Sequence, residues 1–225
     1  MRPRRYRLRV PRAGCASTGL FISFEGTEAG KSTQLDRLER WLRDRGQDPL
    51  RVREPGGTPL GERIRAVLLD RASGEMAAWT ELCLYVASRA QLVAERIGPA
   101  LQAGRVVLAD RFGDASIAYQ GGGRRLGARR VASLNAWATS ALRPDRVFLL
   151  DLDPRIGLER IRAARGADAL DRLEIEALQF HQRVRRAYLS LARREATRYR
   201  VLDARLAPDQ LASAIEAEVA PLLLR

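Results

Sequence analysis

Short apolar runs alternate with longer stretches of helical periodicity from Gly19 onward. The short runs are typical of buried strands, whereas Leu35, Leu38 and Leu42 recur at the spacing of one helix face. This alternation predicts a parallel β-sheet with crossover helices. We expect strands at residues 20–24, 49–52, 106–109, 147–152 and 199–202, and helices at residues 31–45, 61–69, 80–102 and 129–141, with two more helices flanking the last strand.

The length of 225 residues suits one domain with a single sizeable core, which we place at residues 19–225. No stretch approaches the roughly 20 apolar residues of a membrane span, so we expect a soluble protein without a membrane partner. Cys15 and Cys83 are far apart and outside any CxxC spacing. We therefore expect neither a disulfide framework nor a zinc site, and a cytoplasmic location.

The formal net charge is +13, and nearly all of the basic residues are arginines. They are scattered through the expected helices, often beside Glu or Asp, as on a solvated helix surface. No nucleic-acid reader module is found, so we expect no nucleic-acid partner. A positive cleft that attracts a polyanionic nucleotide is the more natural use of this charge.

Residues 1–18 contain six arginines and no acidic residue. This composition predicts a disordered basic N-terminal extension. An extension without a role is the favoured interpretation, and an Arg-rich transit peptide is the alternative. No apolar region follows these charges, which disfavours a secretory signal.

A glycine-rich loop between the first strand and the first helix holds the single lysine of the chain, Lys31. Backbone N–H groups and a helix N-terminus form a positive cradle for phosphates, which a flexible lysine completes. A glycine turn before a capped helix is the alternative, but it does not explain the lysine. The predicted ATP- and phosphate-binding residues are Gly26, Thr27, Glu28, Ala29, Gly30, Lys31, Ser32 and Thr33.

This phosphate-binding loop is one residue short. A standard loop has four residues between its first glycine and the Gly-Lys pair, whereas three residues separate Gly26 from Gly30. Either the turn redistributes its backbone and still binds phosphate, or the missing N–H weakens ATP binding and catalysis.

Five further segments follow one another in a distinctive order. They read REPGGTPLGE at 53–62, LYVASRAQ at 84–91, DRFGDASIAYQG at 110–121, PDRVFLLDLDP at 144–154 and ARGADALDRLE at 164–174. With the phosphate-binding loop, this series resembles the bacterial thymidylate kinases over nearly all of the chain after Gly19. The resemblance implies an α/β, P-loop NTPase-type three-layer fold, with a five-stranded parallel sheet flanked by helices and a lid segment. It also implies phosphoryl transfer from ATP to dTMP, giving dTDP and ADP, with Mg²⁺ as cofactor and a homodimeric assembly.

The resemblance assigns residues to the dTMP site. Tyr85 would stack on thymine and Arg89, one helical turn later, would hydrogen-bond the base, although Tyr85 could instead belong to the core. Arg111 would bind the dTMP phosphate with the bidentate geometry of a guanidinium. The full implied dTMP-binding set is Glu28, Arg53, Tyr85, Arg89, Asp110, Arg111, Tyr119 and Gln120.

The family's lid implies the remaining catalytic groups. Because position 28 is Glu and not Arg, the chain resembles the subgroup whose lid supplies the transition-state cation. Arg162 and Arg165 are the candidates, with Arg172 behind them, and they join Lys31 and Arg111 as the catalytic set. Ser32 and Asp110 would hold or support Mg²⁺.

Two other functions remain open from the sequence. The first is a kinase that acts on another nucleoside monophosphate or on a nucleoside. The presence of Tyr85, Arg89 and Tyr119 argues against this function. A degenerate family member that binds nucleotides without turnover is the other, and the short loop is its only support. His181, the sole histidine, is expected to be a surface or packing residue and not a base.

Overall fold

The structure is a computed structural model that describes residues 19–27, 29–165 and 170–224. The predicted basic extension at 1–18, Glu28 and lid residues 166–169 therefore lie outside the described residues. Five parallel strands form one sheet in the order β2-β3-β1-β4-β5. Their bounds are β1 Phe21–Glu25, β2 Leu50–Arg53, β3 Val107–Asp110, β4 Arg146–Asp151 and β5 Tyr199–Asp203.

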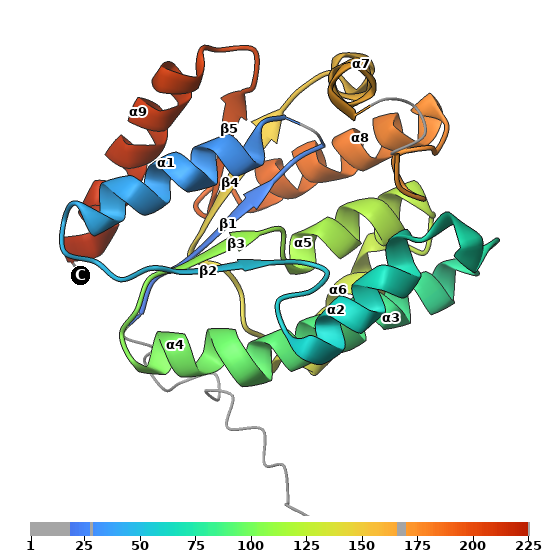
Figure 1. Cartoon of the computed structure of the whole chain (residues 1–225), viewed down its shortest axis with the longest axis horizontal. Helices are drawn as coiled ribbons and strands as arrows, with labels where there is room; N and C mark the ends of the chain where they lie inside the picture. Colours follow the sequence, from blue (N-terminus) through green and yellow to red (C-terminus); the bar gives the residue numbers. More distant parts are fainter. Residues whose placement is uncertain (1–18, 28, 166–169, 225) are drawn as a thin grey trace, which may run out of the picture.

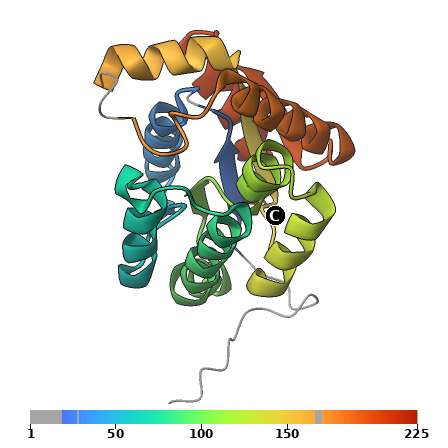
Figure 2. The same ribbon diagram turned by 90° about the vertical axis from the view of Figure 1, so that its right-hand side faces the viewer.

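Helices cover both faces of this sheet, as a buried parallel sheet requires (Figure 1). On one face, α1 (Lys31–Arg43) and α9 (Pro208–Val219) pack apolar side chains against Ile22, Phe24 and Phe148. On the other face lie α3 to α6 and α8 (Figure 2). Their bounds, with those of α2 and α7, are α2 Pro59–Leu69, α3 Ala78–Leu92, α4 Gly98–Gln102, α5 Gly113–Ser116, α6 Ala128–Thr139, α7 Pro154–Arg165 and α8 Leu178–Arg194.

These layers confirm the predicted α/β fold with a five-stranded parallel sheet. Each predicted strand overlaps an observed one within about two residues, a normal boundary error. The helix predicted at 80–102 is confirmed, and it contains a π-helical turn at Val93–Ile97 (η2) between α3 and α4. Pro99 explains the π-helical turn, since proline has no N–H for the carbonyl of residue 95 and its ring crowds that carbonyl.

The strand register brings three loops to one edge of the sheet. Asp110 at the end of β3 pairs with Phe24 of β1 on one side and with Arg53 of β2 on the other. The loops that leave these strands carry the glycine-rich segment, the REPGG segment and Arg111. Ligands of open α/β sheets bind at the carboxyl ends of the strands, so this edge is where a site is expected.

Among the described residues, no helix combines the length and the apolar character needed to cross a bilayer.

Candidate active site

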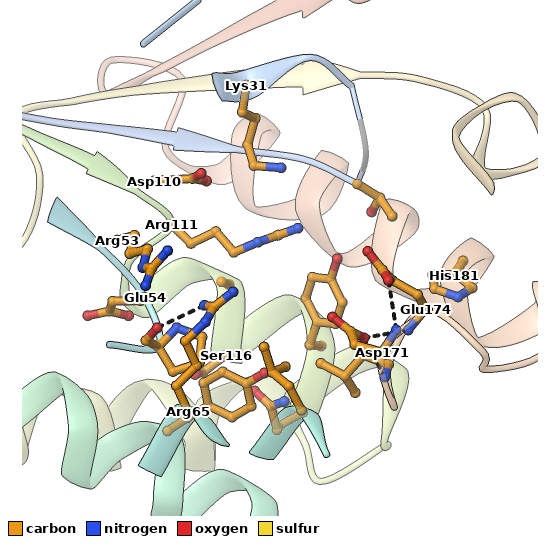
Figure 3. A pocket seen from close by; sticks show the side chains of 18 of the residues that line it. Lys31, Arg53, Glu54, Arg65, Asp110, Arg111, Ser116, Asp171, Glu174 and His181 are labelled. Carbon is orange, nitrogen blue, oxygen red and sulfur yellow. Dashed lines mark hydrogen bonds between the residues drawn. The ribbon is translucent and has the colours of Figure 1, made fainter. Parts of the chain in front are cut away.

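A cavity of about 330 Å³ opens at this edge of the sheet. Figure 3 shows Lys31, Asp110 and Arg111 at one end of it and Asp171, Glu174 and His181 at the other. Polar and charged side chains together make up most of its wall, which suits a charged ligand more than an apolar one. The lining residues are Thr27, Lys31, Ser32, Arg53, Glu54, Pro55, Arg65, Leu69, Tyr85, Asp110, Arg111, Ala115, Ser116, Tyr119, Gln120, Leu158, Ile161, Asp171, Leu173, Glu174 and His181.

The glycine-rich loop is held against the sheet by backbone contacts that only glycine allows. Gly26 has a φ of 119°, and a Cβ there would lie 2.3 Å from the Leu150 carbonyl oxygen. Gly30 precedes α1 with a φ of 81°. Lys31 opens α1, is 7% exposed, and donates from Nζ to the Gly26 carbonyl at 3.2 Å. The lysine therefore lies inside the loop, at the N-terminal end of a helix where anions bind favourably.

The other residues of this loop differ in what they face. Thr27 and Ser32 line the cavity, whereas Ala29 is buried against Leu150. Thr33 is exposed and does not line the cavity. Glu28 lies outside the described residues, so its predicted contact with the substrate has no structural description.

Arg111 follows β3 in a backbone conformation that is unusual for arginine. Its φ is 71°, a region that costs a residue with a Cβ about 1 kcal/mol or more. The Arg111 N–H donates to the Phe24 carbonyl at 3.0 Å, which ties this turn to β1. Its guanidinium lies 5.0 Å from the ring centroid of Tyr119 and lines the cavity. The fold thus holds one arginine at the centre of the sheet edge.

A buried carboxyl group lies directly behind Arg111. Glu25 ends β1, is completely buried, and accepts hydrogen bonds from the Phe112 N–H at 2.9 Å and the Tyr188 hydroxyl at 2.8 Å. Burial raises the pKa of Glu25 to about 8, and the nearby charge of Asp114 adds to this increase. Arg111 acts in the opposite direction, as a positive charge favours the carboxylate.

This raised pKa predicts a dependence of stability on pH. The folded protein keeps a proton on Glu25 between its ordinary pKa of 4.5 and its folded pKa of about 8, while the unfolded chain has lost it. The contribution of Glu25 to the free energy of unfolding is therefore fully present below pH 4.5 and is lost as the pH rises toward 8. A Glu25→Gln variant does not ionise there, so wild type should lose stability relative to this variant over that window. Urea unfolding of both proteins across the window tests this, and parallel profiles would contradict it.

Arg53 and Arg65 supply two further cations to the cavity. Arg53 donates to Glu62 at 3.0 Å, and a second Glu62 oxygen accepts the Gly57 N–H at 2.8 Å. These contacts lower the pKa of Glu62, with the backbone hydrogen bond as the largest cause. Arg65 donates to the Pro55 carbonyl at 2.9 Å, and partial burial lowers its pKa. Thr58 caps α2, with Pro59 at the first helical position, which fixes the orientation of this segment.

Arg89 lies behind the cavity wall and not in it. Its guanidinium is 1% exposed and pairs with Glu54 at 2.6 Å. It also donates to Ser116 at 3.1 Å and to Asn135 at 2.7 Å. Arg89 is absent from the lining of the main cavity, which Glu54 and Ser116 do line, and faces a second cavity bounded by α6. Arg89 is therefore a buried cation that holds the cavity-lining side chains of Glu54 and Ser116 in place.

The other residues predicted at the base subsite do line the cavity. Tyr85 on α3 is partly buried, and burial raises the pKa of its hydroxyl. Tyr119 belongs to a π-helical turn at Ile117–Gly123 (η3), and its ring meets the Phe180 ring edge-on at 6.1 Å. Gln120 donates to the buried Glu81 at 2.9 Å. The three side chains thus come from two elements that share one wall.

Two of the predicted lid arginines have different surroundings in the structure. Arg162 is exposed on α7, where its neighbours Leu158 and Ile161 line the cavity. The side chain of Arg165 lies outside the description. Arg172 is buried, pairs with Glu81 at 2.5 Å and donates to the Leu68 carbonyl at 2.9 Å, so it anchors this segment to α2 and α3.

Sequence reasoning missed several side chains of this site. His181, expected to be a surface or packing residue, is 2% exposed and borders the cavity. Glu54, Arg65, Asp171 and Glu174 also line it. Glu54 and Arg65 lie within or just after the REPGGTPLGE segment, and Asp171 and Glu174 lie in ARGADALDRLE, so those two segments were the available signal.

Comparison with known proteins agrees with this geometry. The sequence profile described as thymidylate kinase matches residues 24–215. The chain is 50% identical to the thymidylate kinase of Desulfovibrio desulfuricans over 207 residues, covering 88% of this chain and 95% of the relative. It is 51% identical to the thymidylate kinase of Deinococcus radiodurans over 204 residues, covering 90% and 97% of the two chains. The chain therefore belongs to the thymidylate kinase family.

Proposed function

We propose that the cavity at the carboxyl edge of the sheet is where this member of the thymidylate kinase family transfers the γ-phosphoryl group of ATP to dTMP, giving dTDP and ADP. The observation that carries the proposal is the shared cavity of Lys31, which begins the helix after β1, and of Asp110 and Arg111 at the end of the adjacent strand β3. A phosphate donor at the N-terminus of α1 and a phosphate acceptor at Arg111 would face each other there. Such transfer depends on positioning and charge stabilisation, and it requires no covalent enzyme intermediate.

Each predicted residue has a role in this proposal. Lys31 contacts the β- and γ-phosphates, while Arg111 and Arg53 hold the acceptor phosphate in line. Tyr85 stacks on thymine and Gln120 forms the polar end of the base subsite, while Arg89, which was predicted to hydrogen-bond the base, holds Glu54 and Ser116 of this wall from behind. Tyr119 crowds the 2′ position of the sugar and favours deoxyribose. Glu28 contacts the substrate near its sugar and phosphate, and Arg162 and Arg165 neutralise transition-state charge from the lid.

Magnesium fits the oxygen donors of this cavity. Ser32 and Asp110 both line it, and Mg²⁺ typically takes one or two protein oxygens together with substrate phosphates. The described residues contain no group of three or more His, Cys, Asp or Glu side chains that could hold a metal without a substrate. When bound with ATP, Mg²⁺ would neutralise charge on the phosphate oxygens.

A coupled ADP-release assay tests the function. Purified protein with Mg²⁺ and ATP should turn over with dTMP, and a panel of dUMP, CMP, AMP and thymidine should support less turnover. Tyr85, Tyr119 and Gln120 in one wall are the reason for this preference. A higher kcat/KM for any other acceptor would refute the proposed substrate.

The short phosphate-binding loop is the reason to consider an alternative function, a module that binds nucleotides without catalysis. A nucleotide-binding module would bind dTMP without ATP turnover, and inserting a glycine between Glu28 and Ala29 should then restore the reaction. The buried position of Lys31 within the loop favours the active enzyme, because the lysine faces the cavity despite the missing residue.

We also propose a homodimer formed through α2, α3 and α6. These helices lie next to one another on one side of the sheet (Figure 1), and they carry large exposed apolar side chains. Trp137 on α6 is 89% exposed, Trp79 on α3 is 47% exposed, and Leu60 and Val67 on α2 are each 48% exposed. Large apolar side chains exposed on neighbouring helices are typical of an association surface. Sedimentation equilibrium should give twice the 25.1 kDa chain mass, and a Trp137→Glu variant should sediment as a monomer.

For location, we propose the cytoplasm, where both nucleotide substrates are available. The exposed free thiol of Cys83 supports a reducing compartment.

A further inference from the structure

Two buried side chains behind Arg111 make none of the substrate contacts proposed above. Glu25 at the end of β1 is completely buried, and Tyr188 on α8 is 1% exposed. Neither lines the cavity. Burying a carboxyl group is costly unless its oxygens are satisfied, so the contacts of this pair indicate what the burial achieves.

The two carboxyl oxygens of Glu25 support the backbone beside Arg111 and, indirectly, the Arg111 guanidinium. Oε1 accepts the N–H of Phe112, the residue directly after Arg111, at 2.9 Å. Oε2 accepts the Tyr188 hydroxyl at 2.8 Å, and that hydroxyl oxygen accepts the Arg111 guanidinium at 3.4 Å. One carboxyl group therefore holds the backbone of the arginine and, through Tyr188, its side chain.

Aromatic rings complete the support. The Tyr119 ring lies under the guanidinium at 5.0 Å, and the Tyr188 ring meets the Tyr119 ring edge-on at 6.3 Å. A free arginine side chain has many rotamers and loses this freedom on binding, whereas a supported one is already oriented. Residues of β1, η3 and α8 therefore hold the Arg111 guanidinium in one orientation in the cavity wall.

We propose that Glu25 and Tyr188 are positioning residues that orient the Arg111 guanidinium toward the acceptor phosphate. The inference rests on the proposed function, in which Arg111 binds the phosphate of dTMP. It assigns the pair to acceptor binding and not to the ATP subsite.

A second buried tyrosine provides a matched control. Tyr199 on β5 is 4% exposed, and its hydroxyl donates to the buried carboxyl of Asp114 at 2.7 Å. Arg198, and not Arg111, lies over its ring, at 5.1 Å. Tyr188→Phe and Tyr199→Phe each remove one hydroxyl from a buried tyrosine–carboxyl pair and keep the ring. A purely structural role predicts similar consequences for both.

The test is steady-state kinetics of the full chain with ATP, Mg²⁺ and dTMP. Tyr188→Phe should raise the KM for dTMP about tenfold, as expected for one hydrogen bond to a charged group, and leave the KM for ATP within about twofold. Tyr199→Phe should leave both constants within about twofold. In an Arg111→Ala background, Tyr188→Phe should produce no further increase, because the group it orients is gone.

A second variant keeps the test independent of how well Tyr188→Phe folds. Glu25→Asp retains the carboxyl group but withdraws it by one methylene, and it should produce the same selective rise in the KM for dTMP. Thermal unfolding of each variant checks that the folded enzyme is being measured.

The outcomes separate the two proposals. If wild type turns over dTMP but Tyr188→Phe and Glu25→Asp leave its KM unchanged, or if Tyr199→Phe changes it equally, the positioning role is wrong. An increase that persists in the Arg111→Ala background would also overturn it. If wild type shows no dTMP-dependent turnover, the proposed function itself fails.

Discussion

Replacing Lys31 with alanine is expected to lower kcat with dTMP by about 10²- to 10³-fold, the usual effect of removing one preorganised donor of charge stabilisation. Lys31 lines the cavity at the first turn of α1, and it is the only lysine of the chain. Its ammonium would meet the phosphate oxygens on which charge accumulates during transfer. The loss should therefore appear in kcat, with a smaller change in the KM for dTMP.

A Lys31→Arg variant sharpens this prediction. The side chain at this position is 7% exposed and folded back toward the Gly26 carbonyl, so a planar guanidinium would not fit the same space. We expect Lys31→Arg to remain impaired although its charge is kept. The matched control is Arg40→Ala on the exposed face of the same helix, which should retain wild-type activity. Full activity of Lys31→Ala would exclude the assigned role.

Removing the lid arginines together is expected to lower kcat by about 10³-fold or more, since arginines that neutralise the transition state contribute on the order of 10³ to 10⁵. Arg162 follows Ile161, which lines the cavity, so closure of α7 over ATP would bring its guanidinium to the transferred group. The Arg162→Ala/Arg165→Ala enzyme should bind dTMP with nearly unchanged KM, because this charge is needed only in the transition state.

Arg160 provides the control for the lid experiment. It is exposed on the same helix, and Arg160→Ala changes the net charge of α7 without removing a predicted catalytic group. Single-turnover measurement with saturating ATP reports the chemical step directly. Equal rates for the double variant and Arg160→Ala would show that neither lid arginine stabilises the transition state.

Arg162 also differs from Arg172, which the sequence grouped with it. Arg172 pairs with the completely buried Glu81, which also accepts from Arg124 at 3.0 Å. Breaking such a pair leaves a buried charge without its partner and typically costs about 3 to 5 kcal/mol of stability. Arg172 therefore has a structural role at the end of the lid segment, whereas Arg162 is exposed on α7.

Much of the fold was predictable because its signals are local. Short apolar runs gave the five strands, and helical spacing of leucines gave α1. The phosphate-binding loop was recognisable from a strand, two glycines and one lysine that are contiguous in the chain. Parallel pairing then requires that these loops emerge at one edge, as the register of Phe24, Arg53 and Asp110 demonstrates.

The sequence by itself determined the fold class, the family and most of the segments that line the cavity, because these depend on periodicity and on short contiguous motifs. Only the tertiary structure decided how the charged side chains are used. Glu25 and Tyr188 are 163 residues apart, Arg172 and Glu81 are 91 apart, and Arg89 and Glu54 are 35 apart. A buried polar or charged group is stable only beside a partner, and the packing of the helices on the sheet determines that partner. An arginine of a motif thus lines the cavity or supports the fold from a buried position according to the layer in which it lies.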